Sequence, residues 1–516
     1  MLLAQRTVIR TLLSEHRWIS PIVLFIVVAT VAGFLQWSQT VPDPDAFYHA
    51  RIATLMRDQA LTFPTLPHAS ATILADQFTD QHFLYHLILI PFVTFFDPLV
   101  GIKVLAILGT ALVFTFFLFT LRHLRIPRPW FFVLLALVTE PFVFRMNLGK
   151  ASALVVFLLI MTIIALLERR QKLLFVTSAV WTWTHGSFLM APLLALIIVG
   201  VDFLRRRTTN EPRVSWWMIM TPFFAALIGV ILGTMLNPYF PRNIAFIVEQ
   251  SLLIPLSSPA LTNAGGEWFP STVEGLLGGA TLLFLAFIFA LPLFFMNKNS
   301  RDHWFLFFMT LFLLALTIRT RRTVEYLVLP MLLFIGTTIG TGQDVLVRIG
   351  NRLRRWLEQE PRLNWGLLLI VGGLILAVTI RDGSTLVKEY RSGISGTTLK
   401  NAATWLRKNS AQDAIVYHTS WDEWPMLFYW NTWNRYLVGL DPRFMSRKNQ
   451  NAFQMWKDAN EGKTPDALAA VIRDQFKASY VLAAKKNEKF IEQIKRFPDV
   501  FKKQYEDGEV TIFSVN

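Results

Sequence analysis

The sequence predicts a polytopic α-helical membrane protein of about eleven transmembrane helices, followed by a soluble α/β domain on the extracytoplasmic side. Three observations predict this fold class. Hydrophobic residues make up 53% of the 516 residues and charged residues only 16%, against about 25% charged in ordinary soluble chains. Several apolar runs are long enough to cross a bilayer, and the hydropathy falls after residue 382. The clearest runs are 21–35, 151–167 and 276–296.

Short basic clusters lie between the apolar runs and predict the orientation. Cytoplasmic loops are enriched in Lys and Arg, so we place all six clusters in the cytoplasm. An even number of crossings then separates neighbouring clusters, which puts the N-terminus inside and the C-terminal domain outside. The clusters are Arg6/Arg10/Arg17, Arg122/Arg125/Arg128, Arg169/Arg170/Lys172, Arg205–Arg207 with Arg213, Lys298/Arg301, and Arg348–Arg362. The predicted spans are 18–37, 98–120, 129–143, 151–168, 171–184, 187–203, 215–236, 276–296, 303–319, 323–341 and 364–381.

This arrangement predicts a transmembrane domain of residues 1–381 and a soluble domain of residues 382–516, anchored in the plasma (inner) membrane. Two long loops, 38–97 and 237–275, are left outside. A further apolar segment, 82–96, would break the parity of the crossings. We expect it to form a helix in the outer interface, with His82 and His86 on its polar side.

Charge and cysteine content exclude several classes of protein. The net charge is +15, but the basic residues lie in short loops between spans and not on one soluble module, which argues against a nucleic-acid partner. The chain has no cysteine, so disulfides, thiolate nucleophiles and cysteine-ligated metals are excluded. Membrane lipids are the partners that this composition predicts.

Short helical and strand-like runs alternate in the C-terminal domain, which indicates a small α/β fold. Helices are expected at 397–408, 464–476 and 490–496, and strands at 414–417, 480–483 and 510–515. The domain lacks a glycine-rich nucleotide loop. Its aromatic segment Trp421-Asp422-Glu423-Trp424-Pro425 has two interpretations: a packed aromatic core with a turn, or a platform for a sugar or peptide with Asp422 as hydrogen-bond acceptor.

Candidate catalytic residues follow the first predicted span. Asp43 and Asp45 flank a proline that stiffens the backbone, and two carboxylates one residue apart suit a hard divalent cation. Such an ion could neutralise a phosphate leaving group. The alternatives are that Asp43 caps the following helix and that His49 packs on a helix face.

Other candidates lie in the remaining outer segments. Glu140, Arg145, Lys150 and His185 fall in short outer turns, and Glu267 and Glu274 in the second long loop. Arg319, Arg321 and Arg322 form the one basic cluster that the count places outside, which suggests an anionic ligand. The simpler readings are solvated loop residues for the glutamates, an interface anchor for His185, and non-specific lipid headgroup contacts for the arginines.

The stretch Asp45-Ala46-Phe47-Tyr48-His49-Ala50-Arg51 resembles the first-loop motif of oligosaccharyltransferase catalytic subunits, which has an Asp, aromatics, an Asn or His, and an Arg six positions after the Asp. Those enzymes are GT-C membrane glycosyltransferases with lipid-linked sugar donors, an acidic first outer loop, many spans and a C-terminal outer domain. The order of features agrees along essentially the whole chain. The resemblance implies a GT-C-like fold and a divalent metal, Mn²⁺ or Mg²⁺.

The resemblance also implies roles for individual residues. Ser271-Thr272-Val273-Glu274 is similar to the element that touches acceptor and metal, so Asp43, Asp45 and Glu274 are the expected catalytic residues and metal ligands. The expected donor-phosphate ligands are Arg51, Arg319, Arg321 and Arg322, and the acceptor-binding pair is Trp421 and Asp422. Two features depart from the family. The acceptor motif keeps two of five residues, and Glu140, Arg145 and Lys150 replace a second acidic pair.

We therefore expect transfer of a sugar or glycan from a polyprenyl phosphate or pyrophosphate to an acceptor on the extracytoplasmic side. Protein, lipid and polysaccharide acceptors all stay open. A transporter or flippase of lipid-linked sugars is the alternative of another class, and a non-catalytic scaffold is the third. The transporter alternative should carry ionisable residues at mid-span depth, and the predicted spans are nearly free of them.

Overall fold

The computed structural model describes residues 19–208, 215–249, 266–297, 299–359 and 361–516. Some sequence predictions fall outside the described residues. They are the basic residues Arg6, Arg10, Arg17, Arg213 and Lys298, and the middle of the second long loop, residues 250–265.

The chain forms two compact units, each built from three segments. The first unit comprises residues 1–38, 104–233 and 269–391 and is helical. The second comprises residues 39–103, 234–268 and 392–516 and contains the C-terminal sheet. The predicted domain boundary at residue 381 stays a prediction.

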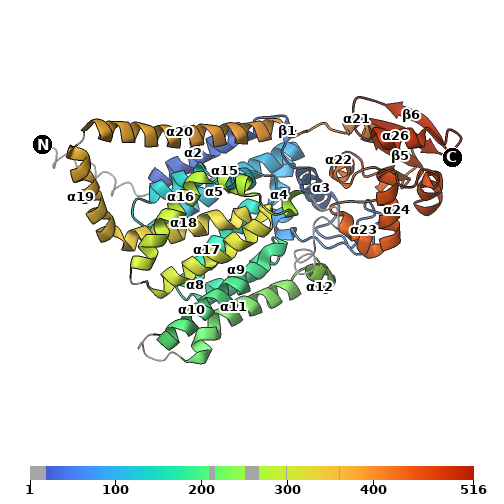
Figure 1. Cartoon of the computed structure of the whole chain (residues 1–516). Coiled ribbons are helices and arrows are strands. Elements are labelled where there is room, and N and C mark those ends of the chain that lie inside the picture. The colour runs from blue at the N-terminus through green and yellow to red at the C-terminus, as the bar shows by residue number, and fades with distance from the viewer. Residues whose placement is uncertain (1–18, 209–214, 250–265, 298, 360) are drawn as a thin grey trace. The chain divides into compact units, whose positions relative to one another are not determined.

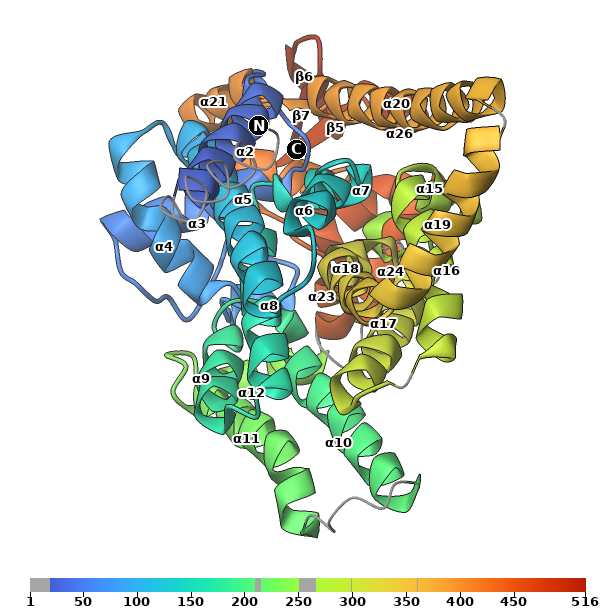
Figure 2. The ribbon, with the colours of Figure 1, turned by 90° about the vertical axis from the view of Figure 1, so that its left-hand side faces the viewer.

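Long apolar helices build the first unit (Figures 1 and 2). The most enclosed of them is α18, with 78% of its apolar window buried, whereas the window of α20 is 11% buried. Helices α6, α8, α16 and α17 all pack against α18, which makes it the centre of this unit. The helices are α2 (Ile19–Gln36), α5 (Pro98–His123), α6 (Pro129–Leu137), α7 (Glu140–Met146), α8 (Ser152–Leu167), α9 (Gln171–Trp181), α10 (Met190–Thr208), α11 (Trp216–Met235), α15 (Val273–Gly278), α16 (Thr281–Met296), α17 (Arg301–Arg319), α18 (Val324–Thr341), α19 (Gln343–Gln359) and α20 (Pro361–Arg391).

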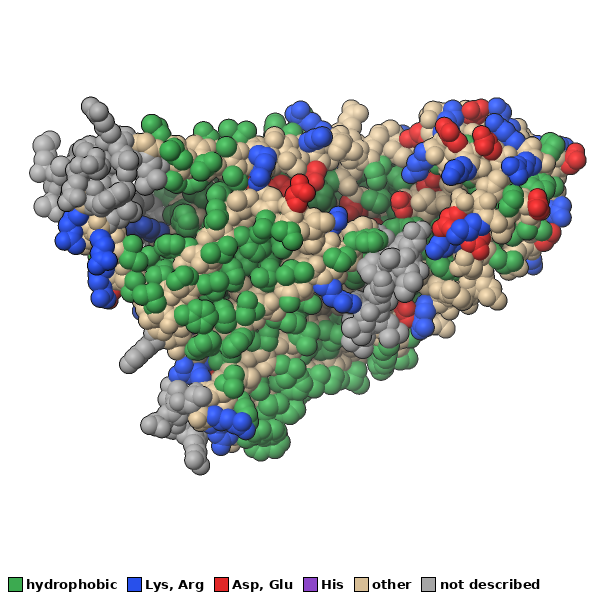
Figure 3. All heavy atoms as spheres, in the orientation of Figure 1, with side chains coloured by type: hydrophobic (Ala, Val, Ile, Leu, Met, Phe, Trp, Pro, Cys, Tyr) green, Lys and Arg blue, Asp and Glu red, His purple; other side chains and the backbone are tan. Residues whose placement is uncertain are grey.

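The membrane character of this unit agrees with the sequence. Within the described residues, seven helices are long and apolar enough to cross a membrane, or eight if the bent pair α6–α7 counts as one. Hydrophobic side chains cover much of the helical surface in Figure 3. The chain is thus a polytopic helical protein, but the predicted number of eleven spans is not confirmed.

Three departures account for the difference in span number. The predicted span 129–143 bends by 79° between α6 and α7, where Pro141 occupies the first turn of α7 and a new helix start is favoured. Helix α9 has 11 residues, short of the roughly 20 that a bilayer requires. Helices α8 and α16 have 16 residues each and are also shorter than a full span.

A five-stranded mixed sheet forms the core of the second unit, in the order β4-β3-β5-β7-β6. Strand β3 pairs in parallel with β4 and β5, whereas β7 runs antiparallel to β5 and β6. The predicted strands at 414–417, 480–483 and 510–515 are confirmed. The strands are β3 (Ile415–His418), β4 (Arg435–Tyr436), β5 (Tyr480–Ala484), β6 (Phe501–Glu506) and β7 (Val510–Val515), and the helices are α21 (Lys400–Asn409), α22 (Trp424–Trp430), α23 (Pro442–Lys448), α24 (Gln450–Asn460), α25 (Leu468–Ala470) and α26 (Glu488–Ile494).

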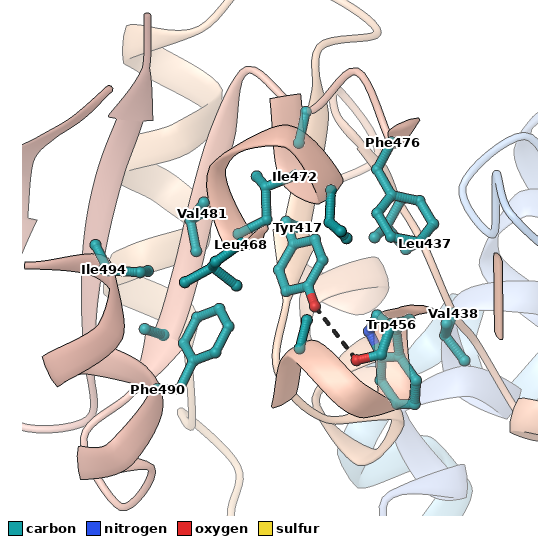
Figure 4. Close-up of a cluster of buried hydrophobic side chains, with 14 of the residues drawn as sticks. Tyr417, Leu437, Val438, Trp456, Leu468, Ile472, Phe476, Val481, Phe490 and Ile494 are labelled. Atoms are coloured by element: carbon teal, nitrogen blue, oxygen red, sulfur yellow. Dashed lines mark hydrogen bonds between the residues drawn. The ribbon is translucent and has the colours of Figure 1, made fainter. Parts of the chain in front are cut away.

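Apolar side chains between this sheet and its helices form a continuous core (Figure 4). Tyr417 on β3 stacks on Phe490 with the ring planes 4° apart, and its hydroxyl donates to the Asn460 side chain at 3.0 Å. Polar groups buried in a core are stable when hydrogen-bonded. The sheet and its helices are therefore joined by a hydrophobic core of their own.

The first long loop folds onto the same sheet. Its helices are α3 (Asp45–Asp58) and α4 (Phe83–Phe95). Helix α12 (Arg242–Ile247), from the second long loop, belongs to the same unit. Strand β1 (Thr40–Val41) pairs with β2 (Ile394–Ser395), and the backbone N–H of Ser70 donates to the carbonyl of Tyr436. Because its backbone is paired with the C-terminal domain, this loop is an ordered part of the second unit.

Candidate active site

The predicted acidic pair lies at the start of α3. The carboxylate of Asp43 accepts from the backbone N–H of Asp45 at 2.9 Å, so it closes the turn that leads into the helix. Asp45 is the first residue of α3 and is partly exposed. Both side chains offer oxygen ligands of the kind that Mg²⁺ and Mn²⁺ prefer.

The histidines of this loop do not occupy the environment that the sequence predicts. His82 and His86 were expected on the polar side of an interfacial helix. In the structure they are 8% and 0% exposed, and α4 packs against α3. His49, on α3, is 2% exposed and its ring lies 4.9 Å from that of His86. The polar side of α4 thus faces protein, because α3 presents a matching polar side chain.

Arg51 is partly buried in the second unit. Its Nε donates to the carbonyl of Phe428 on α22 at 3.3 Å, and burial lowers the pKa of the guanidinium from its usual value. This contact ties α3 to the C-terminal domain. The donor-phosphate role of Arg51 stays a prediction.

The aromatic segment of the C-terminal domain divides between core and surface. Trp424 is fully buried and stacks on Phe428 with ring centroids 4.7 Å apart, as a packed core requires. Trp421 is partly buried and Asp422 is exposed, both in the short helix η6 (Trp421–Glu423). The core interpretation therefore applies to Trp424, and the partly buried Trp421 also packs against the core of the domain, while Asp422 keeps access to solvent.

The two glutamates of the second long loop belong to different units. Glu267 is partly buried in η4 (Gly266–Trp268) of the second unit. Glu274 is exposed on α15 of the first unit. Within the described residues, no three His, Asp or Glu side chains converge closely enough to hold a metal ion.

Within the first unit, the structure brings the Ser271–Glu274 element beside the predicted basic cluster. The Ser271 hydroxyl donates to the carbonyl of Thr317 at 2.7 Å. Arg321 reaches the carbonyl of Pro270 through its Nε at 3.2 Å. Arg319 and Arg321 are exposed. These contacts join α15 to the turn between α17 and α18.

The most informative contact of this cluster joins His185 and Arg322. Backbone N–H of Ser187 donates to His185 Nδ1 at 3.0 Å. The Ser187 hydroxyl also lies 2.8 Å from Nδ1, and it accepts from the indole N–H of Trp181 at 3.2 Å. Ser187 and Trp181 therefore hold the His185 imidazole in place.

The same imidazole contacts Arg322. Arg322 Nη2 lies 2.7 Å from His185 Nε2, within hydrogen-bond distance. This contact brings His185 into the basic cluster of Arg319, Arg321 and Arg322, and guanidinium groups suit phosphate. The cluster is thus a candidate phosphate site, and the sequence had placed His185 and Arg322 among its candidates without linking them.

Glu140 and Arg145, which stand where the family has its second acidic pair, contact other parts of the first unit. Arg145 on α7 makes a buried ion pair with Glu325 on α18, with Nε and Oε2 3.0 Å apart. Ser152 donates to the same Glu325 oxygen at 2.9 Å. The backbone N–H of Glu140 donates to the carbonyl of Gly279. Glu325 and Ser152 were missed, because nothing in their local sequence marks them as polar partners of Arg145.

Comparison with solved structures shows that the fold is similar to those of an archaeal oligosaccharyltransferase and of ArnT. An oligosaccharyltransferase from Archaeoglobus fulgidus in its apo form superposes with a TM-score of 0.61 at 13% identity, over 92% of this chain and 71% of that one. Archaeal AglB from the same organism, in complex with an inhibitory peptide and a dolichol-phosphate, gives 0.61 at 13% identity, over 97% of this chain and 75% of that one.

ArnT from Cupriavidus metallidurans, bound to undecaprenyl phosphate, superposes with a TM-score of 0.57 at 12% identity, over 96% of this chain and 97% of that one. At such identities the likeness establishes the fold alone. No protein-family model matches the sequence, and no curated protein matches it.

Proposed function

We propose that the protein is a membrane glycosyltransferase that uses a polyprenyl phosphate or pyrophosphate sugar as donor. The observation that carries this proposal is the basic cluster in which Arg322 Nη2 lies 2.7 Å from His185 Nε2, next to the exposed Arg319 and Arg321. Guanidinium groups bind phosphate strongly, often through two hydrogen bonds. The GT-C fold supports the proposal, since AglB and ArnT were solved with dolichol-phosphate and undecaprenyl phosphate.

In the proposed reaction an acceptor hydroxyl or amide attacks the anomeric carbon, which develops oxocarbenium character. The bond from that carbon to the phosphate oxygen breaks, and Arg322 and His185 stabilise the charge that develops on the leaving phosphate. Asp45 acts as a metal ligand or as the base that takes the acceptor's proton. The extracytoplasmic side of the reaction and the Mn²⁺ or Mg²⁺ requirement are parts of the proposal.

The test is transfer of a labelled sugar from a polyprenyl phosphate donor in membranes that contain the wild type, Asp45→Ala or Arg322→Gln. Protein, lipid and polysaccharide acceptors are compared, each with Mn²⁺, Mg²⁺ or a chelator. We expect transfer in the wild type and its loss in both variants. Movement of intact donor across the bilayer without transfer would instead favour the transporter.

A further inference from the structure

Helix α19 connects two apolar helices of the first unit and has two chemically different faces. Arg348, Arg352 and Arg355 follow one another at intervals of four and three residues, so they share one face of the helix. Val345 and Ile349 are also four residues apart and mark a second, apolar face. A basic face beside an apolar one is typical of helices that lie in a membrane interface.

The neighbours of α19 place it at one membrane surface. Helices α18 and α20 are both long and apolar enough to cross a bilayer, and α19 packs against both. The chain between two consecutive spans lies at one of the two surfaces of the membrane. In Figures 1 and 2, α19 runs steeply across the direction of α20. Its direction is therefore that of a surface helix and not of a further span.

The surface where α19 begins is an arginine-rich end of the first unit. Gly342, which follows α18, is so close to the end of α16 that an added Cβ would lie 3.2 Å from Asn297 Nδ2. Arg301, at the start of α17, makes an ion pair with Asp202 on α10 at 2.6 Å. Asp202 also lies 3.9 Å from Arg169, between α8 and α9. Loops that the sequence predicts to be cytoplasmic thus meet where α19 begins, and the cytoplasmic leaflet is the one that attracts basic segments.

The exposed side chains of α19 suit an anionic bilayer surface. Arg348, Arg352 and Arg355 are all exposed, and the helix carries four arginines against two acidic residues. Ile349 is 51% exposed, so the described part of the chain covers the apolar face only in part. Guanidinium groups bind phosphate strongly, and an exposed isoleucine beside them is stabilised when it leaves water for the acyl boundary.

We propose that α19 is an interfacial anchor that binds anionic phospholipids of the inner leaflet. Its apolar face enters the boundary between headgroups and acyl chains. Arg348, Arg352 and Arg355 bind the phosphate groups of the same lipids. The inference concerns how the first unit is held in the bilayer, and it does not depend on the proposed transfer reaction.

The depth of the helix is measured with spin labels, which the lack of cysteine in the chain makes specific. The full-length protein carries one nitroxide, at Ile349→Cys or at Asn351→Cys, in vesicles of phosphatidylglycerol and phosphatidylcholine. Relaxation by oxygen, which concentrates among acyl chains, and by a water-soluble nickel chelate gives the depth of each label. We expect the label at residue 349 below the headgroups and the label at residue 351, on the polar side, in contact with water.

The arginines are tested by lipid preference. A fluorophore at Asn351→Cys is quenched by nitroxide-labelled phosphatidylglycerol or phosphatidylcholine, and the ratio gives the local preference for the anionic lipid. Each Arg→Gln change at positions 348, 352 and 355 should lower this preference by about fivefold, the contribution of one basic residue near an anionic surface. Added salt should weaken the preference in the wild type.

The matched control removes the same charge from three exposed basic residues of the C-terminal domain and should leave the preference unchanged. The control substitutions are Lys495→Gln, Arg496→Gln and Lys502→Gln. Should the α19 variants fail to fold, the two label depths and the lipid preference of the protein with all its arginines decide the question.

Three results would overturn the inference. Two water-exposed labels would mean that α19 projects into solvent. A label at residue 349 that neither oxygen nor the nickel chelate reaches would mean that protein, and not lipid, covers the apolar face. Equal quenching by the two lipids would mean that the arginines do not bind anionic headgroups.

Discussion

His185 Nε2 and Arg322 Nη2 lie 2.7 Å apart in the first unit, although 137 positions separate the two residues. His185 precedes α10 and is positioned by Ser187, whose backbone nitrogen lies 3.0 Å from Nδ1. Arg322 precedes α18. The contact brings an imidazole and a guanidinium together, and both groups can bind a phosphate oxygen.

Donor affinity should therefore depend on both residues. We expect His185→Gln and Arg322→Gln each to weaken binding of a polyprenyl phosphate by about 10- to 100-fold, since a hydrogen bond to a charged group contributes about 1.5–3 kcal/mol. Titration of the purified protein with the lipid phosphate measures this. Binding of the uncharged polyprenol should not change, and exposed Arg496→Gln in the C-terminal domain is the control. Equal losses for phosphate and polyprenol would contradict the assignment.

The buried ion pair of Arg145 and Glu325 should govern the stability of the first unit. Glu325→Gln removes the carboxylate that both Arg145 and Ser152 contact, and breaking a buried pair costs about 3–5 kcal/mol. Thermal unfolding in detergent should show a clearly lowered midpoint. The control is Asp302→Asn, which removes the half-exposed partner of Arg301 and should change the midpoint little. Equal midpoints in the two variants would count against a structural role.

Local sequence signals recovered the long apolar helices and the inner strands. Apolar runs and basic clusters depend only on neighbouring residues, so these helices and β3, β5 and β7 were predicted. The helix expected at 464–476 was wrong in its length, since α25 covers Leu468–Ala470 and a π-helical turn follows over Val471–Gln475. Strand β6 was missed because its sequence, Phe501-Lys502-Lys503-Gln504-Tyr505-Glu506, is mostly polar, as suits an edge strand. Strand β4 has only two residues and leaves no periodic signal.

The sequence predicted individual residues of the candidate site but not which residues contact one another. His49, His86, His185 and Arg322 could be selected from sequence because polar residues stand out beside apolar spans. Their partners could not, since Asp80, whose Oδ2 lies 2.6 Å from His86 Nδ1, looks like any loop acid. Pairs such as Arg145 and Glu325, 180 positions apart, come together only through folding, and no periodicity records such a pairing.

Close packing of Gly439 against Trp424 gives a test of the aromatic core. A Cβ at Gly439 would lie 2.5 Å from the indole ring, and the indole is fully buried. We expect Gly439→Ala to destabilise the C-terminal domain by about 1–3 kcal/mol, the usual cost of overpacking. Gly508→Ala, where a Cβ would meet nothing within 4 Å, is the control. Hydrogen exchange of β3 measures both, and equal protection in the two variants would show that the indole can move aside.

The last prediction concerns two buried titratable neighbours, His418 and Glu423. His418 Nδ1 donates to the carbonyl of Ser420 at 2.8 Å, and its Nε2 accepts from the backbone N–H of Val438 at 3.2 Å. Burial lowers the pKa of His418 from 6.5 to about 4. Burial also raises the pKa of Glu423 from 4.5 to about 7. Both groups are therefore neutral in the folded domain near pH 6.

These two shifts act on stability in opposite directions. Between about pH 4 and 6.5 the unfolded chain binds more protons at His418 than the folded domain, so this residue makes stability rise with pH. Between about pH 4.5 and 7 the folded domain binds more protons at Glu423, so this residue makes stability fall as pH rises. In the wild type the two effects largely cancel between about pH 4.5 and 6.5. When one residue of the pair is replaced by Gln, the free energy of unfolding should vary with pH as the other residue dictates. The slope of that variation approaches about 1.4 kcal/mol per pH unit.

Hydrogen exchange of the β3 strand in the full-length protein, corrected for the intrinsic pH dependence of exchange, measures these slopes. Relative to the wild type, the protection of β3 in Glu423→Gln should increase more from pH 4.5 to 6.5, because of this pair only His418 still titrates. In His418→Gln it should decrease relative to the wild type over the same range, because of this pair only Glu423 still titrates. Slopes of the same sign in the two variants would mean that at least one of these groups is charged in the folded domain, which its burial opposes.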